Sequence, residues 1–431
     1  MRRHALLSAL LIVIASTAAG QVPAASPSAN LRVFIDNCPC DQDYLRREIT
    51  FVEYMRDRAD AQVHVLFSTQ STGAGGTAYS MFLIGLGEFD GEADTLRFAA
   101  EPGQTQDSTR RTLARSLKIG LMRYVARTPA AHGIEITFTG PPGGAGPAAA
   151  DAVRDPWNFW VFQTRIGGFA EGEKSRSFLS GHASVSASRT TEGWKARFSA
   201  DGGYDESKFT FLPSTEFPAG RVRRDYSYSA SGSAMIVRSA GPYFSVGVLS
   251  SAASGTRRNL NLAARGGPAV EYSLFPYDES SRRQLTVLYS AGYNSFDYRE
   301  ETLYLQTAEA RPDHTVLVSY EFTQPWGTAS ASISGQQFLD DTDLYAGSAF
   351  GNANIRLFRG LSLNFFFSAA TIYNQIYVPL AGATDEEILL NRRQLQTPYR
   401  FFVDVGLVYS FGSIYNTIVN PSFANTPSTI F

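Results

Sequence analysis

Alternating apolar and polar residues run through the chain from Trp157 to Phe411, and this pattern constrains the fold more than any other feature. In DVGLVYSF, residues 404–411, the odd positions are all apolar or aromatic, and the even positions are mostly small or polar. Because successive side chains of a strand point to opposite faces, the pattern predicts strands with one apolar face. Twelve such segments begin near residues 157, 177, 193, 222, 242, 258, 282, 313, 326, 342, 360 and 397.

The number and spacing of these segments favour a membrane-spanning barrel over a soluble β-sandwich, the alternative that also alternates. The number is even, as in single-chain outer-membrane barrels. Tight turns near 191–193, 240–242, 278–282, 324–326 and 359–360 alternate with mostly longer connections. Short turns face the periplasm in such barrels. We therefore predict a 12-stranded antiparallel transmembrane β-barrel over residues 157–411, with both of its ends in the periplasm.

Aromatic residues gather near the predicted periplasmic strand ends. Amphipathic rings are most stable where the bilayer core meets the headgroups. We therefore predict an aromatic girdle made of Trp157, Trp160, Trp194, Trp326 and Phe411. Since lipid offers no hydrogen-bond partner to a free strand edge, the sheet is expected to close on itself.

Charged residues fall on the polar face of the same segments. A charge that faces lipid at mid-bilayer costs about 2–4 kcal/mol, so these side chains are expected to line the lumen. Two interpretations remain open: a cationic excess that favours anionic solutes, or acids and bases that pair and plug the lumen. The predicted lining residues are Arg165, Lys195, Arg197, Asp201, Arg265, Glu271, Glu321, Arg356, Arg400 and Asp404.

The last predicted strand carries a motif of its own. Asp404-x-Gly406-x-x-Tyr409-x-Phe411 resembles the C-terminal β-signal of bacterial outer-membrane proteins. The resemblance implies that the barrel-assembly machinery recognises Gly406, Tyr409 and Phe411. One departure is that residues 412–431 follow as a C-terminal tail, whereas the usual signal ends the chain. The whole layout resembles uncharacterised bacterial outer-membrane proteins in which a periplasmic α/β domain precedes the barrel.

Before the barrel, the sequence divides into three parts. Residues 1–20 combine a basic start with a short apolar run and small residues, which predicts a cleaved signal peptide. Residues 31–140 predict a periplasmic α/β sandwich with helices over 41–58 and 106–127 and strands over 31–35, 62–67, 78–89, 95–99 and 134–138. The Gly/Pro/Ala-rich residues 141–156 predict a flexible linker.

Two local features of the N-terminal part are candidates for function. Cys38 and Cys40 are the two cysteines of the chain, and an exported protein allows them a disulfide; free thiols are the alternative. The helix over 106–127 is basic and carries no acid after Asp107, so it could bind an anionic partner, although such faces are usually only solvated.

The sequence contains no strong catalytic signature. His182 near Ser180 and Ser184 is the nearest arrangement to a nucleophile with its base, but GxSxG, P-loop and HExxH motifs are absent. A net charge of -2 gives no reason to expect nucleic acid. We therefore expect no enzyme, cofactor or metal centre. The expected partners are outer-membrane lipid, the barrel-assembly machinery and an unidentified periplasmic partner.

The function predicted first is a small outer-membrane pore for polar, in particular anionic, solutes. The alternative is an envelope structural or assembly protein that uses the barrel as an anchor and the periplasmic domain to bind a partner. A barrel-embedded hydrolase is the third hypothesis.

Overall fold

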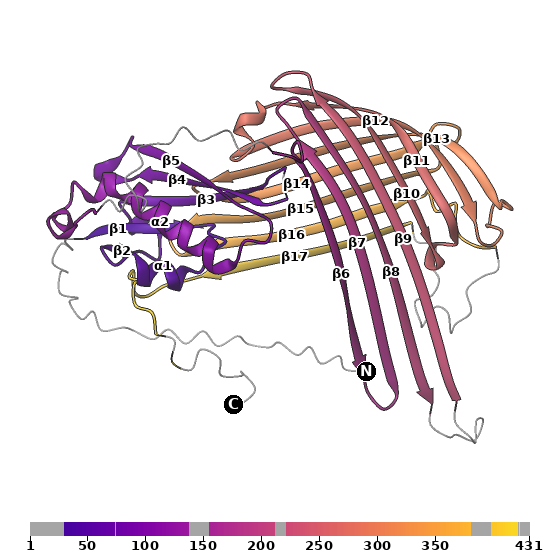
Figure 1. Cartoon of the computed structure of the whole chain (residues 1–431), viewed down its shortest axis with the longest axis horizontal. Coiled ribbons are helices and arrows are strands. Elements are labelled where there is room, and N and C mark those ends of the chain that lie inside the picture. Colours follow the sequence, from indigo (N-terminus) through magenta and orange to yellow (C-terminus); the bar gives the residue numbers. More distant parts are fainter. Residues whose placement is uncertain are drawn as a thin grey trace, which may run out of the picture.

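A computed structural model describes residues 30–73, 75–137, 155–211, 221–380, 398–420 and 422. The predicted signal peptide and nearly all of the predicted linker lie outside these ranges. The described chain forms a five-stranded sheet and a 12-stranded sheet (Figure 1). Among the described helices, none is both long and apolar enough to cross a membrane.

The N-terminal domain is a sheet covered on one face by two helices. Its elements are β1 (Leu31–Asp36), α1 (Gln42–Glu48), β2 (Val52–Tyr54), β3 (Val63–Ser71), β4 (Thr77–Gly85), β5 (Ala93–Ala100) and α2 (Gln106–Val125). The strand order is β2-β1-β3-β4-β5, with β1 parallel to β2 and β3 and the remaining pairs antiparallel. The core lies between helices and sheet, where Leu113, Leu117 and Leu121 of α2 pack with Val65 and Leu83.

Two predictions about this domain were wrong at the level of elements. The first helix ends at Glu48 rather than near residue 58, and Val52–Tyr54 forms a strand that pairs with Leu31–Val33. Residues 49–52, Ile-Thr-Phe-Val, favour strands over helices, so pairing with β1 prevails over helical periodicity. Residues 134–137 form no strand and follow a short 3-10 helix, Pro129–Gly133.

All twelve strands predicted after residue 155 are present, and each is antiparallel to its neighbour in the chain. Their order follows the sequence without a crossover. They are β6 (Trp160–Gly172), β7 (Arg176–Thr190), β8 (Trp194–Phe211), β9 (Arg221–Ser239), β10 (Phe244–Gly255), β11 (Leu260–Ser273), β12 (Arg283–Tyr298), β13 (Ala308–Gln324), β14 (Gly327–Phe338), β15 (Tyr345–Phe358), β16 (Leu361–Ile372) and β17 (Tyr399–Tyr409).

The large sheet has two ends, β6 and β17. Within the described residues no pairing joins these two strands. Figure 1 shows a strongly twisted sheet in which β6 to β9 run at a steep angle to β14 to β17. The N-terminal domain lies beside the ends of β14 to β17 (Figure 1). At these ends, short turns connect neighbouring strands of the large sheet.

Candidate functional site

The strand register places all ten predicted lining residues on one face of the large sheet, which we call the inner face. For example, Arg165 lies opposite Ser184, which lies opposite Asp201. Arg265 lies opposite Ser251 and Asn294. The same alternation carries Lys195, Arg197, Glu271, Glu321, Arg356, Arg400 and Asp404 to this face.

The opposite, outer face is apolar and exposed. Ile166 of β6 is 81% exposed and Ile333 of β14 is 62% exposed. Of the predicted girdle, Trp160 and Trp194 lie on this face, Trp326 lies in a short turn, and Trp157 and Phe411 lie just outside β6 and β17. Their rings contact further aromatic side chains: Trp160 stacks on Phe162 and Phe198, and Trp326 packs on Phe322. Of the β-signal residues, Gly406 lies on the inner face and Tyr409 on the outer face.

Charges on the inner face fall into two groups. Arg265 donates from Nε to both carboxylate oxygens of Asp313 at 2.9 Å, and Asp313 is fully buried. Gln336 also donates to Asp313. By contrast, some basic side chains have no ion pair in the described part of the chain: Arg165, Lys195, Arg197 and Arg400.

A pocket of about 820 Å³ lies on the inner face at the short-turn ends of β8 to β12. Its wall combines aliphatic side chains such as Met235, Leu249 and Leu288 with Lys195 and Glu271. The Tyr277 hydroxyl donates to Glu271 at 3.2 Å and lies 3.0 Å from the Ser245 hydroxyl. Part of the inner face is therefore apolar, whereas the sequence predicted polar and charged side chains on this face.

At the long-loop end, the connection that follows β16 packs on the inner face. Ile376 is buried against Phe338, Leu344 and Phe296. Asn374 donates to Gln336. The same connection pairs with the one after β12 through Thr302 and Pro379. These contacts cover part of the inner face at the long-loop end of the sheet.

The helix-free face of the N-terminal sheet docks on the short turns of the large sheet. Phe34 and Phe82, both nearly buried, lie under the guanidinium groups of Arg356 and Arg282 at 4.7 and 4.9 Å from the ring centres. The Ser68 hydroxyl donates to the Ser281 carbonyl at 2.6 Å. The N-terminal sheet is therefore covered on both faces, by its helices on one side and by these short turns on the other.

Two acids of the domain bind the turn between β15 and β16. Arg359 donates to Asp60 at 2.8 Å, and the Gly360 amide donates to Asp57 at 2.8 Å. Gly360 has φ of 75°, a conformation that glycine adopts without strain. Asp57 is buried, and its two carboxylate oxygens accept from this amide and from the Ala59 amide.

Asp36, His64 and Arg356 form a polar cluster at this docking interface, in which the His64 side chain is fully buried. His64 Nε2 lies 3.0 Å from Asp36 Oδ2, and Arg356 donates to Asp36 Oδ1 at 3.5 Å. Burial opposes ionisation of Asp36, but the His64 hydrogen bond and the Arg356 charge outweigh it and lower the pKa of Asp36 below 3.8. Burial lowers the pKa of His64 below 6.5, although Asp36 partly offsets it. His64 is therefore neutral at pH 7 and donates from Nε2 to the Asp36 carboxylate.

The C-terminal tail extends the N-terminal sheet beyond β2. Tyr415 bridges to Met55 in antiparallel orientation. The Arg56 amide donates to the Ile414 carbonyl at 2.9 Å, and the Asn416 amide donates to the Tyr54 carbonyl at 2.8 Å. The tail therefore connects the last strand of the large sheet to the edge of the small one.

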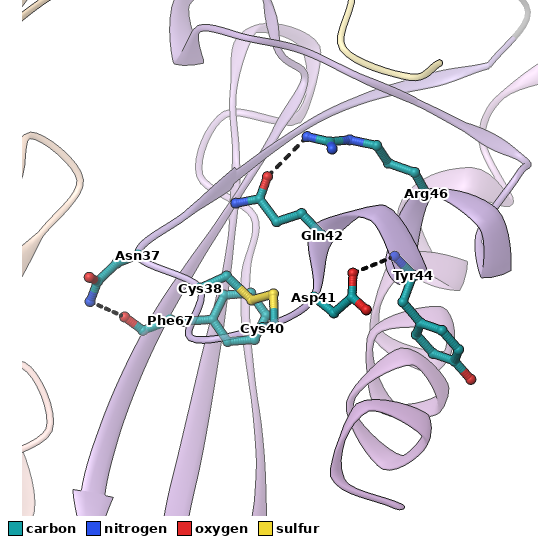
Figure 2. The surroundings of a disulfide bond; sticks show 8 residues. All are labelled: Asn37, Cys38, Cys40, Asp41, Gln42, Tyr44, Arg46 and Phe67. Atoms are coloured by element: carbon teal, nitrogen blue, oxygen red, sulfur yellow. Dashed lines mark hydrogen bonds between the residues drawn. A yellow bond between two sulfur atoms is a disulfide. The ribbon is translucent and has the colours of Figure 1, made fainter. Parts of the chain in front are cut away.

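Cys38 and Cys40 form a disulfide between β1 and α1 (Figure 2). The preceding Asn37 donates to the Phe67 carbonyl at 3.0 Å, and Asp41 caps α1 by accepting from the Tyr44 amide. Both cysteines are half-buried against the domain core. The disulfide therefore fixes the turn that follows Asp36.

The other candidates from the sequence are not assembled into sites. His182 is exposed and lies over Gly167, while Ser180 donates to Asp205 at 2.8 Å. On α2 and just after it, most basic side chains pair within the domain: Arg110 and Arg111 with Asp107, Lys118 with Glu48, and Arg123 and Arg127 with Glu92. In the described ranges, no group of three or more His, Cys, Asp or Glu is placed to hold a metal ion.

No family model and no curated protein matches this sequence. Among solved structures, the chain is similar to the translocator domain of autotransporter NalP from Neisseria meningitidis. The identity is 15%, the match covers 70% of this chain and 98% of that chain, and the TM-score is 0.28. At this similarity, the match carries neither fold nor activity to this chain.

Proposed function

We propose that this protein is a bacterial outer-membrane β-barrel without enzymatic activity, whose N-terminal domain covers its periplasmic mouth. Its lumen passes small polar solutes and prefers anions. The observation that carries the proposal is the division of the large sheet into an exposed apolar outer face and a charged inner face. Soluble monomers rarely expose contiguous apolar patches above a few hundred Å². In lipid, an exposed apolar face carries no free-energy penalty.

We attribute the anion preference to Lys195 and Arg197, which lie two residues apart on the inner face of β8. Lys195 and Arg197 lie on β8 near the short-turn end, and no ion pair within the described residues neutralises them. Cationic side chains around a narrow aqueous path attract anions and repel cations. Arg265 and Arg356 contribute less, because Asp313 and Asp36 neutralise them.

The docked domain provides a means of limiting passage. Its helix-free face lies on short turns that would form the periplasmic rim. Solutes would have to pass around the domain, or the domain would have to move. Loss of the contacts made by Asp57 and Asp60 should therefore raise conductance.

Single-channel recording in planar bilayers tests this proposal with the full-length chain. We expect small or infrequent conductance steps from the wild type, and larger or more frequent steps from Asp57→Ala/Asp60→Ala. The matched control is Asp90→Ala/Asp94→Ala, because neither acid contacts the rim in the described residues. Adding Lys195→Gln/Arg197→Gln should abolish the anion preference. Silence from every variant, in protein shown to be folded and inserted, would overturn the pore.

A second candidate is a structural or assembly protein of the envelope, and the docking interface favours it. A domain held on the rim by several buried contacts and by the tail is placed to bind a periplasmic partner. The barrel would then serve as an anchor in lipid. Gly406, Tyr409 and Phe411 would serve the barrel-assembly machinery under either function. Silent recordings from folded protein would leave this candidate standing.

A further inference from the structure

The two end strands of the large sheet are the starting observation. β6 and β17 each pair with one neighbour in the described chain, so each leaves one edge of backbone groups without a strand partner. An open edge cannot persist in lipid, where no water is present to bond it. The side chains at the two edges show how the edges fit each other.

Aromatic rows on the inner face stop at both edges. Phe350, Phe366 and Phe402 form one row across β15, β16 and β17, with ring centres 5.3 and 5.7 Å apart. Phe169 and Phe178 form another across β6 and β7, with ring centres 5.4 Å apart. The terminal rings are both more than half exposed, at 57% for Phe169 and 56% for Phe402. Each row therefore ends in a ring that lacks a neighbour on its edge side.

Charges on the inner face of the two edges are complementary when the strands run antiparallel. From the short-turn end outward, β6 carries Arg165 and then Glu171, whereas β17 carries Asp404 and then Arg400. None of the four has an ion pair within the described residues. If the two edges approach each other, a basic side chain therefore lies near an acidic one both close to the short-turn end and farther from it.

We propose that β6 pairs antiparallel with β17 in the register that sets Phe169 opposite Phe402 and closes the barrel. The proposal rests on the membrane location proposed above. In this register Glu171 lies opposite Arg400, and Arg165 lies diagonal to Asp404, within reach of long side chains. The two aromatic rows become continuous.

The outer face matches in the same register. Ile166 lies opposite Val405, Phe162 opposite Tyr409, and Trp160 opposite Phe411. The apolar band and the girdle therefore continue across the junction. In the register shifted by two residues, Arg400 would face Phe169 and Glu171 would face Pro398. That shift breaks the aromatic row and removes the Glu171–Arg400 pair, so it is disfavoured.

Cysteine cross-linking in full-length protein refolded into phosphatidylcholine vesicles tests the register. The test variant is Phe169→Cys/Phe402→Cys, and the matched control is Phe169→Cys/Arg400→Cys, which reports the shifted register. After oxidation with copper phenanthroline, peptide mass mapping separates the new cross-link from the native Cys38–Cys40 disulfide. We expect an intramolecular link in most of the test variant and in little of the control.

Every other outcome of that experiment overturns the proposal. A link mainly in the control variant would establish a different register. A link between two chains would mean that the edges pair between copies. No link in folded, inserted protein would mean that the edges stay apart.

Charge reversal supplies a second measurement that does not depend on cysteines. Glu171→Arg and Arg400→Glu should each lower the fraction of chains that migrate as a compact band on unheated gels, at least twofold. The double variant Glu171→Arg/Arg400→Glu should restore that fraction. A compact fraction no higher than that of the more affected single variant would contradict a contact between residues 171 and 400. A closed but silent barrel overturns only the pore, and a conducting chain without the 169–402 link overturns only this register.

Discussion

At the scale of single residues, the partner of each charged side chain decides whether its charge is neutralised. Arg265 and Lys195 both lie on the inner face, yet Arg265 is held by a buried Asp313 and Lys195 lies at the wall of an open pocket. Arg356 also lies on the inner face but contacts the N-terminal domain through Asp36 and Phe34. Alternation therefore predicts the face of a side chain but not its role.

The buried pair gives a prediction of stability. Asp313→Ala leaves Arg265 in the sheet interior without its acid, and removing one partner of a buried ion pair typically costs about 3–5 kcal/mol. Urea unfolding in detergent micelles, followed by tryptophan fluorescence, should show a loss of this order. The control Asp201→Ala removes an exposed acid that accepts from Ser231 and should cost far less. Equal losses from both variants would show that the pair does not stabilise the sheet.

The buried His64 predicts that acid weakens the docked domain. Its pKa is lowered below 6.5, so the unfolded chain takes up this proton before the folded chain does. The free energy of unfolding should therefore fall as pH drops below about 6.5. Asp36, whose pKa is also lowered, contributes stability present above pH 3.8 and lost as pH falls further.

Hydrogen exchange of β1 and β3 measures this effect. Wild-type protection factors should be lower at pH 5.5 than at pH 7.5, and His64→Gln, which keeps a donor for Asp36 but cannot be protonated, should remove most of the difference. A pH dependence that survives in His64→Gln would assign it to other groups.

At the scale of elements, the edges of the two sheets are finished by segments distant in sequence. The short β2 is a free edge within its own sheet, and residues 414–416 of the tail cover it. Periodicity could not predict this strand addition, because the tail has no alternation of its own and the pairing joins opposite ends of the chain. The same holds for β2, which local helical spacing had assigned to a helix.

The tail pairing predicts an effect of proline. Asn416→Pro removes the amide that donates to the Tyr54 carbonyl, whereas Ile418→Pro lies beyond the paired residues and is 92% exposed. Limited proteolysis should cut the tail several-fold faster in Asn416→Pro than in wild type. Ile418→Pro should be cut at nearly the wild-type rate, and equal rates for both variants would indicate that the pairing does not form in solution.

At the scale of the whole molecule, the two faces of the large sheet determine its surroundings. The outer face is apolar across the large sheet, including Leu363 and Phe365 of β16, and the domain packs on the turns that follow β11 and β15. The N-terminal domain docks at the end of the sheet that the sequence predicts to face the periplasm. This arrangement makes lipid the natural neighbour of the outer face and water that of the inner face.

Neighbouring positions on β14 test that orientation. Ile333→Arg places a charge on the outer face and should cost about 2–4 kcal/mol if that position lies near mid-bilayer. Ser332→Arg places the same charge on the inner face and should be much better tolerated. The measurement is the fraction of chain that inserts into vesicles and resists added protease. Equal tolerance of both variants would contradict a lipid-facing outer surface.

The sequence by itself determined the number, order and faces of the twelve strands, because a period of two is a local property that each strand carries alone. It also placed the ten charged residues on one face. Only the tertiary structure decided which of those charges are paired, where the domain docks and what the tail covers. Ion pairs, docking faces and added strands depend on contacts between residues far apart in the chain, and no local period encodes them.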